Sequence, residues 1–383
     1  MIDPSVAPLP TTSTQRPDQL RVAIAGLGFG ESVHLPALQA GALTKPVALW
    51  HPRPQRVAEA AERAGLRAYH DFDALLADPD IAALVIATPP GPRFDLAKAA
   101  LEAGRHLLLE KPVALNGDQV QELQRLALQR NLCVAVDFEY RAVPLFLQMA
   151  DLLAAGVVGD PWLVRIDWLM GSRSDPARPW SWYSQGDAGG GVLGALGTHA
   201  FDMLHWWFGP VRSVQGLCST AIRERPLAAG HGAMGPVDAE DIALVQLELE
   251  GGTGRPIPAQ MSLASVARQG RGCWIEIYGS EATLVLGSDN QSDYVHGFQL
   301  WLGRPGETLR PVPADPRHAF ARTWGDGRVA PVLRLQQWWA EAIRDGRPMV
   351  PGLTEALSSQ RCCDQIRFSR SGWSSAPSTG ADL

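Results

Sequence analysis

The feature that most constrains this chain is an alternation, between residues 21 and 138, of short apolar runs and helical segments. The apolar runs are RVAIAG, PVALW, ALVIATPP, HLLLEKP and LCVAVDF, and segments with a helical pattern, such as RVAEAAERAG, lie between them. Apolar runs without polar interruptions are typical of parallel strands that are covered by helices on both faces. The sequence therefore predicts a doubly wound α/β domain, with one of its helices over 118–130.

After residue 138 the pattern changes to longer runs in which polar and apolar residues alternate: WLVRIDWLM, DIALVQLELE, QMSLAS and CWIEIYG. This period of two predicts an α+β domain built on a large, mostly antiparallel open sheet. Residues 221–240, rich in Gly, Pro and Ala, are expected to form loops outside that sheet. We expect two closing helices, at 331–345 and 353–370. The chain should divide into four regions: a disordered leader (1–17), the parallel-sheet domain (18–138), a substrate and oligomerisation domain (139–372) and a frayed tail (373–383).

Length and charge narrow the class of protein. A chain of 383 residues exceeds the size of most single cores, which favours two domains. A net charge of −6 leaves no basic field for nucleic acid or an anionic membrane, and no apolar run approaches the roughly 20 residues that cross a bilayer. The five cysteines form no CxxC pair and the histidines show no zinc-ligand spacing, so we expect no metal. Without a secretory signal at the start, the sequence predicts a cytoplasmic protein.

The first apolar run ends in a glycine-rich turn, AGLGFGE. Gly26 would permit a tight turn, and Gly28 would let the backbone approach a pyrophosphate at the next helix N-terminus, with Phe29 and Gly30 beside it. The third position of the GxGxxG fingerprint holds Glu31, with Gly30 one residue early, so the match is incomplete. Its place between a strand and a helix nevertheless favours a dinucleotide site over a turn that is merely rich in glycine.

The second run is followed by His51-Pro52-Arg53, with Arg56 close behind and no acidic residue. The missing carboxylate removes repulsion of a 2′-phosphate, and Arg53 or Arg56 could pair with that phosphate, which favours NADP, with NAD as the alternative. A simpler interpretation leaves both arginines solvated and His51 near the adenosine.

The third run ends in ATPP, where Thr88 and Pro89 lie at the carboxyl end of the predicted strand. Open sheets bind ligands at this edge, so both residues are expected to line the cofactor site. A turn that simply terminates the strand would also explain the two prolines.

The fourth run, HLLLEKPVAL, places Glu110 and Lys111 at the carboxyl end of a buried strand. The following proline restricts Lys111 to extended geometry, from which the ammonium could orient and polarise a substrate oxygen. Glu110 is expected to hold the ammonium, and both residues are expected near the cofactor. Only three lysines occur in the chain, which favours a special role for this one over a structural ion pair.

The segment GGGVLGALGTHAFDMLHWWFG predicts a helix that begins near Leu196. His199 would lie in its first turn, where the helix dipole favours a neutral imidazole able to exchange a proton. Asp202, three residues later on the same face, would support it. A core histidine bonded to Asp202 is the alternative. Tyr183, in WSWY, is expected to project toward the cleft, where aromatic rings stack on sugars, although packing in the core would also account for it.

These segments together resemble the glucose-fructose oxidoreductase, inositol dehydrogenase and rhizopine-catabolism (Gfo/Idh/MocA) family over residues 20–370. The likeness rests on GLGFGESVHLPAL, on ATPP followed by AALEAGRHLLLEKP, and on GGGVLGALGTHAFD, in the order and spacing of the family. The resemblance implies a Rossmann domain plus an open-sheet domain, NAD or NADP, and a sugar, cyclitol or related polyol substrate. It also implies a homodimer or homotetramer assembled through the large sheet, with Lys111 and His199 at the catalytic lysine and histidine positions.

Two positions depart from the family pattern. Ala195 stands where many members carry an aspartate, four residues before His199. Either Lys111 and His199 suffice, or Asp202, Tyr183 or the substrate supplies the proton path, or catalysis is lost. Arg93 stands where the family often has histidine, and the sequence indicates no role for it.

The resulting hypothesis is an NAD(P)-dependent oxidoreductase that transfers hydride between nicotinamide and a hydroxyl or carbonyl substrate. Ala195 motivates one alternative, a protein that binds NAD(P) as a sensor or regulator without turnover. A second alternative is a redox-neutral enzyme of the glycosidase or epimerase type that uses bound NAD.

Overall fold

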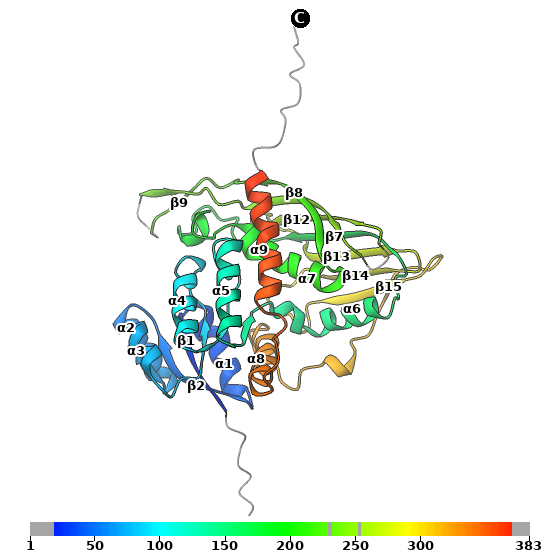
Figure 1. The fold of residues 1–383 in the computed structure, drawn as a ribbon. Coiled ribbons are helices and arrows are strands. Elements are labelled where there is room, and N and C mark those ends of the chain that lie inside the picture. The colour runs from blue at the N-terminus through cyan, green and yellow to red at the C-terminus, as the bar shows by residue number, and fades with distance from the viewer. Residues whose placement is uncertain (1–18, 229–231, 252–253, 370–383) are drawn as a thin grey trace, which may run out of the picture.

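The computed structural model describes residues 19–228, 232–251 and 254–369 (Figure 1). The expected leader and tail, 1–17 and 373–383, lie outside these residues. The predicted doubly wound sheet is confirmed: six parallel strands lie in the order β3-β2-β1-β4-β5-β6. They are β1 (Leu20–Ala25), β2 (Thr44–Trp50), β3 (Arg67–Tyr69), β4 (Ala83–Ile86), β5 (His106–Leu109) and β6 (Val134–Val136).

Both faces of the parallel sheet are buried under helices. Val22 and Ile24 of β1 pack into one hydrophobic cluster and Ala23 and Ala25 into another, which is why the strand has no polar alternation. β3 was not predicted from the sequence, because this edge strand has only three residues, none of them fully buried. The helices are α1 (Leu35–Ala40), α2 (Pro54–Ala64), α3 (Phe72–Ala77), α4 (Pro90–Glu102) and α5 (Gly117–Gln129), the last one matching the predicted helix at 118–130.

The second sheet has eight strands in the order β16-β15-β14-β13-β7-β12-β11-β8. All neighbours are antiparallel except β7 and β12, so the prediction of a mostly antiparallel sheet is confirmed. The strands are β7 (Pro161–Leu169), β8 (Val211–Ser219), β11 (Ile242–Leu249), β12 (Ile257–Ala264), β13 (Gly272–Gly279), β14 (Thr283–Ser288), β15 (Gln299–Gly303) and β16 (Arg310–Pro311).

Residues 221–240 lie outside the large sheet, as predicted, but the expectation of loops alone was wrong. β9 (Glu224–Pro226) and β10 (Met234–Pro236) pair with each other as a short antiparallel ribbon. Three paired residues on each strand are too few to give a clear alternation in the sequence.

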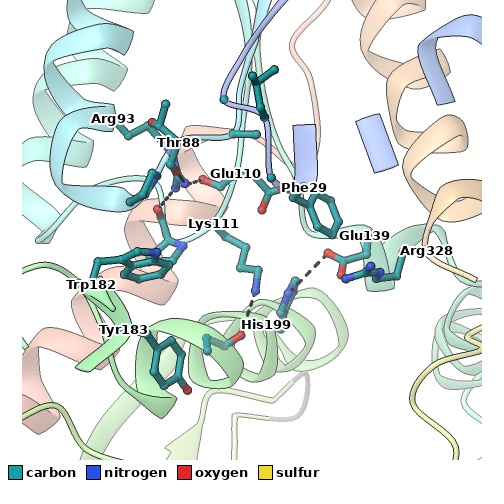
Figure 2. A pocket seen from close by; sticks show the side chains of 18 of the residues that line it. Phe29, Thr88, Arg93, Glu110, Lys111, Glu139, Trp182, Tyr183, His199 and Arg328 are labelled. Atoms are coloured by element: carbon teal, nitrogen blue, oxygen red, sulfur yellow. Dashed lines mark hydrogen bonds and ion pairs between the residues drawn. The ribbon is translucent and has the colours of Figure 1, made fainter. Parts of the chain in front are cut away.

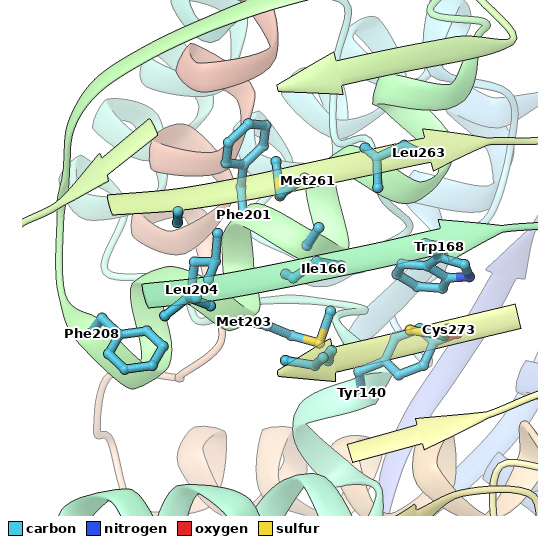
Figure 3. Close-up of a cluster of buried hydrophobic side chains, with 14 of the residues drawn as sticks. Tyr140, Ile166, Trp168, Phe201, Met203, Leu204, Phe208, Met261, Leu263 and Cys273 are labelled. Atoms are coloured by element: carbon cyan, nitrogen blue, oxygen red, sulfur yellow. The ribbon is translucent and has the colours of Figure 1, made fainter. Parts of the chain in front are cut away.

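One face of the large sheet carries α6 (Pro144–Ala154) and α7 (Thr198–Phe208). Figure 3 shows side chains of α7 and of the sheet packed into one buried cluster, with Phe201, Met203 and Leu204 from the helix facing Ile166, Trp168, Met261 and Leu263. Most of α7 is buried, polar residues included, so the helix brings His199 into the protein interior.

The two closing helices, α8 (Val329–Arg344) and α9 (Leu353–Phe368), return to the parallel sheet. Leu335 and Trp339 of α8 join the cluster on one face of that sheet, and Leu353 of α9 joins the cluster on the other, while α9 also packs along α5 and α7. Segments far apart in the sequence therefore cover the parallel sheet together (Figure 1). None of the helices in the described part of the chain is long and apolar enough to cross a bilayer.

Candidate active site

A pocket of about 660 Å³ runs from the glycine-rich turn after β1 to α7 of the second domain. Its walls include the carboxyl ends of β1, β2, β4 and β5, the edge at which open α/β sheets bind ligands. The volume falls in the range of cofactor and small-molecule sites, roughly 300–1,000 Å³. The pocket therefore has the place and size of a cofactor and substrate site (Figure 2).

The three glycines of the turn have different roles. Gly26 has φ +107°, and a Cβ on it would lie 2.7 Å from the Ala87 carbonyl oxygen, so only glycine fits. Gly28 lines the pocket and has no atom within 4 Å of the place a Cβ would take, which leaves space for a ligand. Gly30 does not line the pocket; a Cβ on it would lie 2.8 Å from Ile24 Cγ2. It thus permits close packing of the π-helical turn Gly30–His34 on β1, the role expected of the third fingerprint glycine.

At the nucleotide end, His51 and Arg56 line the pocket, whereas Arg53 is exposed and is not among the lining residues. The backbone N–H of Arg53 instead donates to His51 Nδ1 (3.1 Å), and burial together with Arg56 lowers the pKa of that imidazole. Phe29, Thr88 and Pro89 also line the pocket. Thr88 Oγ1 is buried and has no hydrogen-bond partner within the described residues, so it is available to a ligand.

Lys111 points into the pocket, and its Nζ donates to the carbonyl oxygen of Ala195 (3.0 Å; Figure 2). The expectation that Glu110 holds this ammonium was wrong. Glu110 Oε1 accepts a hydrogen bond from His34 Nε2 (2.9 Å), and Gln336 Nε2 of α8 donates to His34 Nδ1 (3.2 Å). Consecutive residues of an extended segment point to opposite sides, which separates the carboxylate from the lysine side chain.

Glu110 belongs to a buried cluster with His34 and Asp137, whose Oδ2 lies 3.5 Å from His34 Nε2. Burial opposes ionisation of Glu110, but His34, Asp137 and Lys111 together outweigh it and the pKa falls to about 2. Burial and the Glu110 charge raise the pKa of Asp137 well above its usual value. All three residues are of types that bind metals, with ligand atoms within 4.8 Å of one another, but here they pair with one another.

Arg93, for which the sequence indicated no role, joins two segments of the site. Its buried guanidinium donates to the carbonyl oxygens of Thr88, Glu110 (2.7 Å) and Pro112. Burial lowers its pKa to about 10, so the guanidinium stays charged at neutral pH. Arg93 thus ties the ATPP segment to the segment that carries Lys111.

His199 lies in the first turn of α7 with its ring buried against Tyr140, the ring centroids being 4.9 Å apart. Burial and then Lys111 lower the pKa of His199 well below its usual value. The imidazole is therefore neutral at physiological pH, for a reason other than the predicted helix dipole. A π-helical turn, Leu193–Gly197, runs directly into α7, so His199 is not at a free helix N-terminus.

Asp202 does not support His199, contrary to the sequence-based expectation. Arg141 Nε and Nη2 each donate to one carboxylate oxygen of Asp202 (2.8 Å), and Asp202 is not among the pocket-lining residues. Glu139 takes the place expected of Asp202, because its Oε2 lies 3.5 Å from His199 Nε2.

Tyr183 and its neighbour Trp182 line the pocket, as predicted for aromatic residues that project toward the cleft. The guanidinium of Arg173 stacks on the Tyr183 ring, 3.3 Å from its centroid.

The sequence analysis did not predict that Arg173, Arg328 and Glu139 line the pocket. Only Glu139 had a usable signal, since it follows the last apolar run of the parallel sheet directly.

Comparison with known proteins agrees with this architecture. Residues 20–138 match the family model described as "Oxidoreductase family, NAD-binding Rossmann fold", and residues 150–373 match its companion for the C-terminal alpha/beta domain. The chain belongs to the Gfo/Idh/MocA family. It is accordingly an NAD-binding oxidoreductase, and the resemblance found in the sequence is confirmed.

Three similar proteins match this chain over most of their length. An uncharacterized oxidoreductase of Synechocystis sp. is 43% identical, covering 90% of this chain and 92% of its own. The levoglucosan dehydrogenase of Pseudarthrobacter phenanthrenivorans is 29% identical over 77% of this chain and 84% of its own. A solved levoglucosan dehydrogenase in complex with NADH and levoglucosan superposes with a TM-score of 0.82 at 25% identity, covering 92% of this chain and 98% of that structure.

Proposed function

We propose that this Gfo/Idh/MocA protein is a dehydrogenase or reductase that transfers hydride between a nicotinamide cofactor and a carbon bearing oxygen in a sugar, cyclitol or related compound. The observation that carries the proposal is that Lys111 and His199, from different domains, line the same pocket as the Gly26–Gly28 turn. Levoglucosan dehydrogenase, a similar protein, binds NADH and levoglucosan, which supports a sugar-like substrate.

The residues of the pocket fit a dinucleotide. Gly28 leaves open space, Thr88 Oγ1 lacks a partner among the described residues, and Phe29 and Pro89 provide apolar walls. When bound, the cofactor supplies the hydride donor or acceptor.

Lys111 and His199 would have different roles in the reaction. The Lys111 ammonium, which donates to the Ala195 carbonyl, would donate to the substrate oxygen and stabilise negative charge that develops there. The neutral His199 imidazole would take the hydroxyl proton during oxidation and return it during reduction. Trp182 and Tyr183 offer rings on which a sugar can stack.

For the cofactor we propose NADP rather than NAD. Arg56 lines the nucleotide end of the pocket beside His51, and no carboxylate follows β2 to repel a 2′-phosphate. Arg53, the other candidate, is exposed and does not line the pocket. Titration with NADPH and NADH, followed by nicotinamide fluorescence, tests this choice. Tighter binding of NADPH that is lost in Arg56→Ala supports the proposal, and equal or tighter binding of NADH contradicts it.

The catalytic assignment is tested with Lys111→Ala. The substrates are a panel of sugars and polyols, with levoglucosan as the first candidate. We expect kcat to fall roughly 10²–10⁴-fold. Cofactor binding should be retained, because the glycine turn does not depend on Lys111. Lys98→Ala is a matched control, since this exposed lysine pairs with Glu122 on the surface. Wild-type activity in Lys111→Ala, or no turnover of any polyol by the wild type, would refute the proposal.

We also propose that the protein forms a homodimer or homotetramer through the large sheet. The face of this sheet that points away from α7 exposes Leu217 and Leu244, which are neighbours on paired strands β8 and β11.

A further inference from the structure

Glu139 is a buried acid for which the proposed reaction has so far no use. It begins a short 3₁₀ turn, Glu139–Ala142, that follows β6 directly, and it lines the pocket with only 6% of its surface exposed. Its Oε2 lies 3.5 Å from His199 Nε2, on the side of the ring toward Arg328 (Figure 2).

Within the described residues, no cationic side chain other than His199 lies within ion-pair distance of this carboxylate, although the charges of Lys111 and Arg328 act on it from farther away. Arg328, the cation drawn beside it in Figure 2, gives hydrogen bonds of 2.8 and 2.6 Å to Asp326. Within the described residues, His199 is the group that pairs with Glu139, in contrast to Asp202, which receives both hydrogen bonds of Arg141. A buried acid that has no cation in direct contact is costly, and such acids gather at functional sites.

No other acid near His199 reaches the pocket. Ala195, one helical turn before the histidine, carries no carboxylate, and Asp202 does not line the pocket, so α7 itself provides His199 with no acid there. We propose that Glu139 is the positioning residue of His199: its carboxylate, which lies beside Nε2, stabilises and holds in place the imidazolium that forms when His199 takes a proton. This inference rests on the proposed function.

Oxidation of a CH–OH group breaks the C–H bond, whose electron pair leaves as hydride to the nicotinamide ring, and breaks the O–H bond, whose proton goes to His199. The C=O bond forms from the remaining oxygen electrons. The new imidazolium carries one positive charge, which the Glu139 carboxylate offsets. Reduction runs through the same steps in reverse.

A defined pH dependence follows from the surroundings of Glu139. Lys111, Arg328, His199, Glu110, Asp137, Tyr140 and Tyr294 are the titratable or charged groups that face it. Burial raises the pKa of Glu139 to about 7, against the opposing effect of Lys111. Above that pH the carboxylate is charged and can stabilise an imidazolium, and below it the neutral acid cannot. The rate of oxidation should therefore fall as the pH drops through about 7.

The activity test compares Glu139→Gln with Glu307→Gln, a matched change at an exposed position of the second domain. With a polyol that the wild type oxidises, we expect Glu139→Gln to lower kcat roughly 10²-fold, to leave KM and cofactor binding unchanged, and to lose the fall in rate near neutral pH. Glu307→Gln should behave as the wild type. Glu139→Gln with the wild-type kcat and an unaltered pH profile would overturn the inference.

A second measurement needs no turnover, so it separates failure of this inference from failure of the proposed function. In the purified full-length protein, the infrared carboxyl band that disappears in Glu139→Gln should titrate near neutral pH. In His199→Asn, whose side chain ends short of Nε2, the carboxylate loses its polar neighbour, and the midpoint should rise by about one unit, a tenfold change in proton affinity. A midpoint that does not move would overturn the inference, whether or not the wild type oxidises any sugar.

Discussion

The role of a buried charged residue depends on the group with which it pairs. Glu110 bonds to His34 rather than to Lys111, and Asp202 bonds to Arg141 rather than to His199. Removing one member of such a pair leaves the other buried without compensation, which costs more than the pair itself contributes. The residues at the site are therefore divided into charges that hold the structure and charges that face the pocket.

Asp202→Ala tests this division. We expect it to destabilise the protein by about 3–5 kcal/mol, measured by urea unfolding, because the Arg141 guanidinium would remain buried without its carboxylate. The folded fraction should keep its kcat, since Asp202 does not line the pocket. A loss of kcat at unchanged stability would mean that Asp202 serves His199 after all.

Among the helices, α8 lies late in the sequence but packs on the parallel sheet of the first domain. Trp339 is fully buried in the cluster that covers one face of the parallel sheet, and Gln336 on the same helix donates to His34 behind Glu110. The helix thus contributes both to the core of the first domain and to the hydrogen-bond network of the site, although it follows the first domain by nearly two hundred residues.

Shortening the Trp339 side chain should therefore lower the stability of the protein. We expect Trp339→Ala to lower the free energy of unfolding by about 3–5 kcal/mol, with weaker cofactor binding at temperatures where α8 detaches. Its neighbour Trp338 is only partly buried and packs at the margin of the same cluster, so Trp338→Ala is the control with a smaller loss. Equal losses in the two variants, measured by denaturant unfolding, would contradict a core role for α8.

For the molecule as a whole, the large sheet has one covered face and one open face. The covered face packs on α6 and α7, whereas the other exposes 47% of Leu244 and 44% of Leu217. Exposed apolar side chains side by side on a broad sheet favour contact with a second surface of the same kind.

Leu244→Arg should accordingly weaken self-association. We expect a dimer or tetramer for the wild type by light scattering and a smaller species for the variant, because two like charges would meet across a symmetric interface. Leu128→Arg, at an exposed leucine of α5 in the first domain, should leave the mass unchanged. A monomeric wild type, or no effect of Leu244→Arg, would rule out this interface.

The sequence alone determined the features that depend on neighbours along the chain. These are the parallel strands, whose burial on both faces removes polar alternation, the Gly26–Gly28 turn, and the position of Lys111 at a strand end. The tertiary structure alone decided which segments meet: Glu139 with His199, Arg141 with Asp202, and α8 with the first domain. The physical reason is that local spacing fixes the direction of a side chain, whereas the partner of a buried charge is whichever complementary group long-range packing brings within a few ångströms.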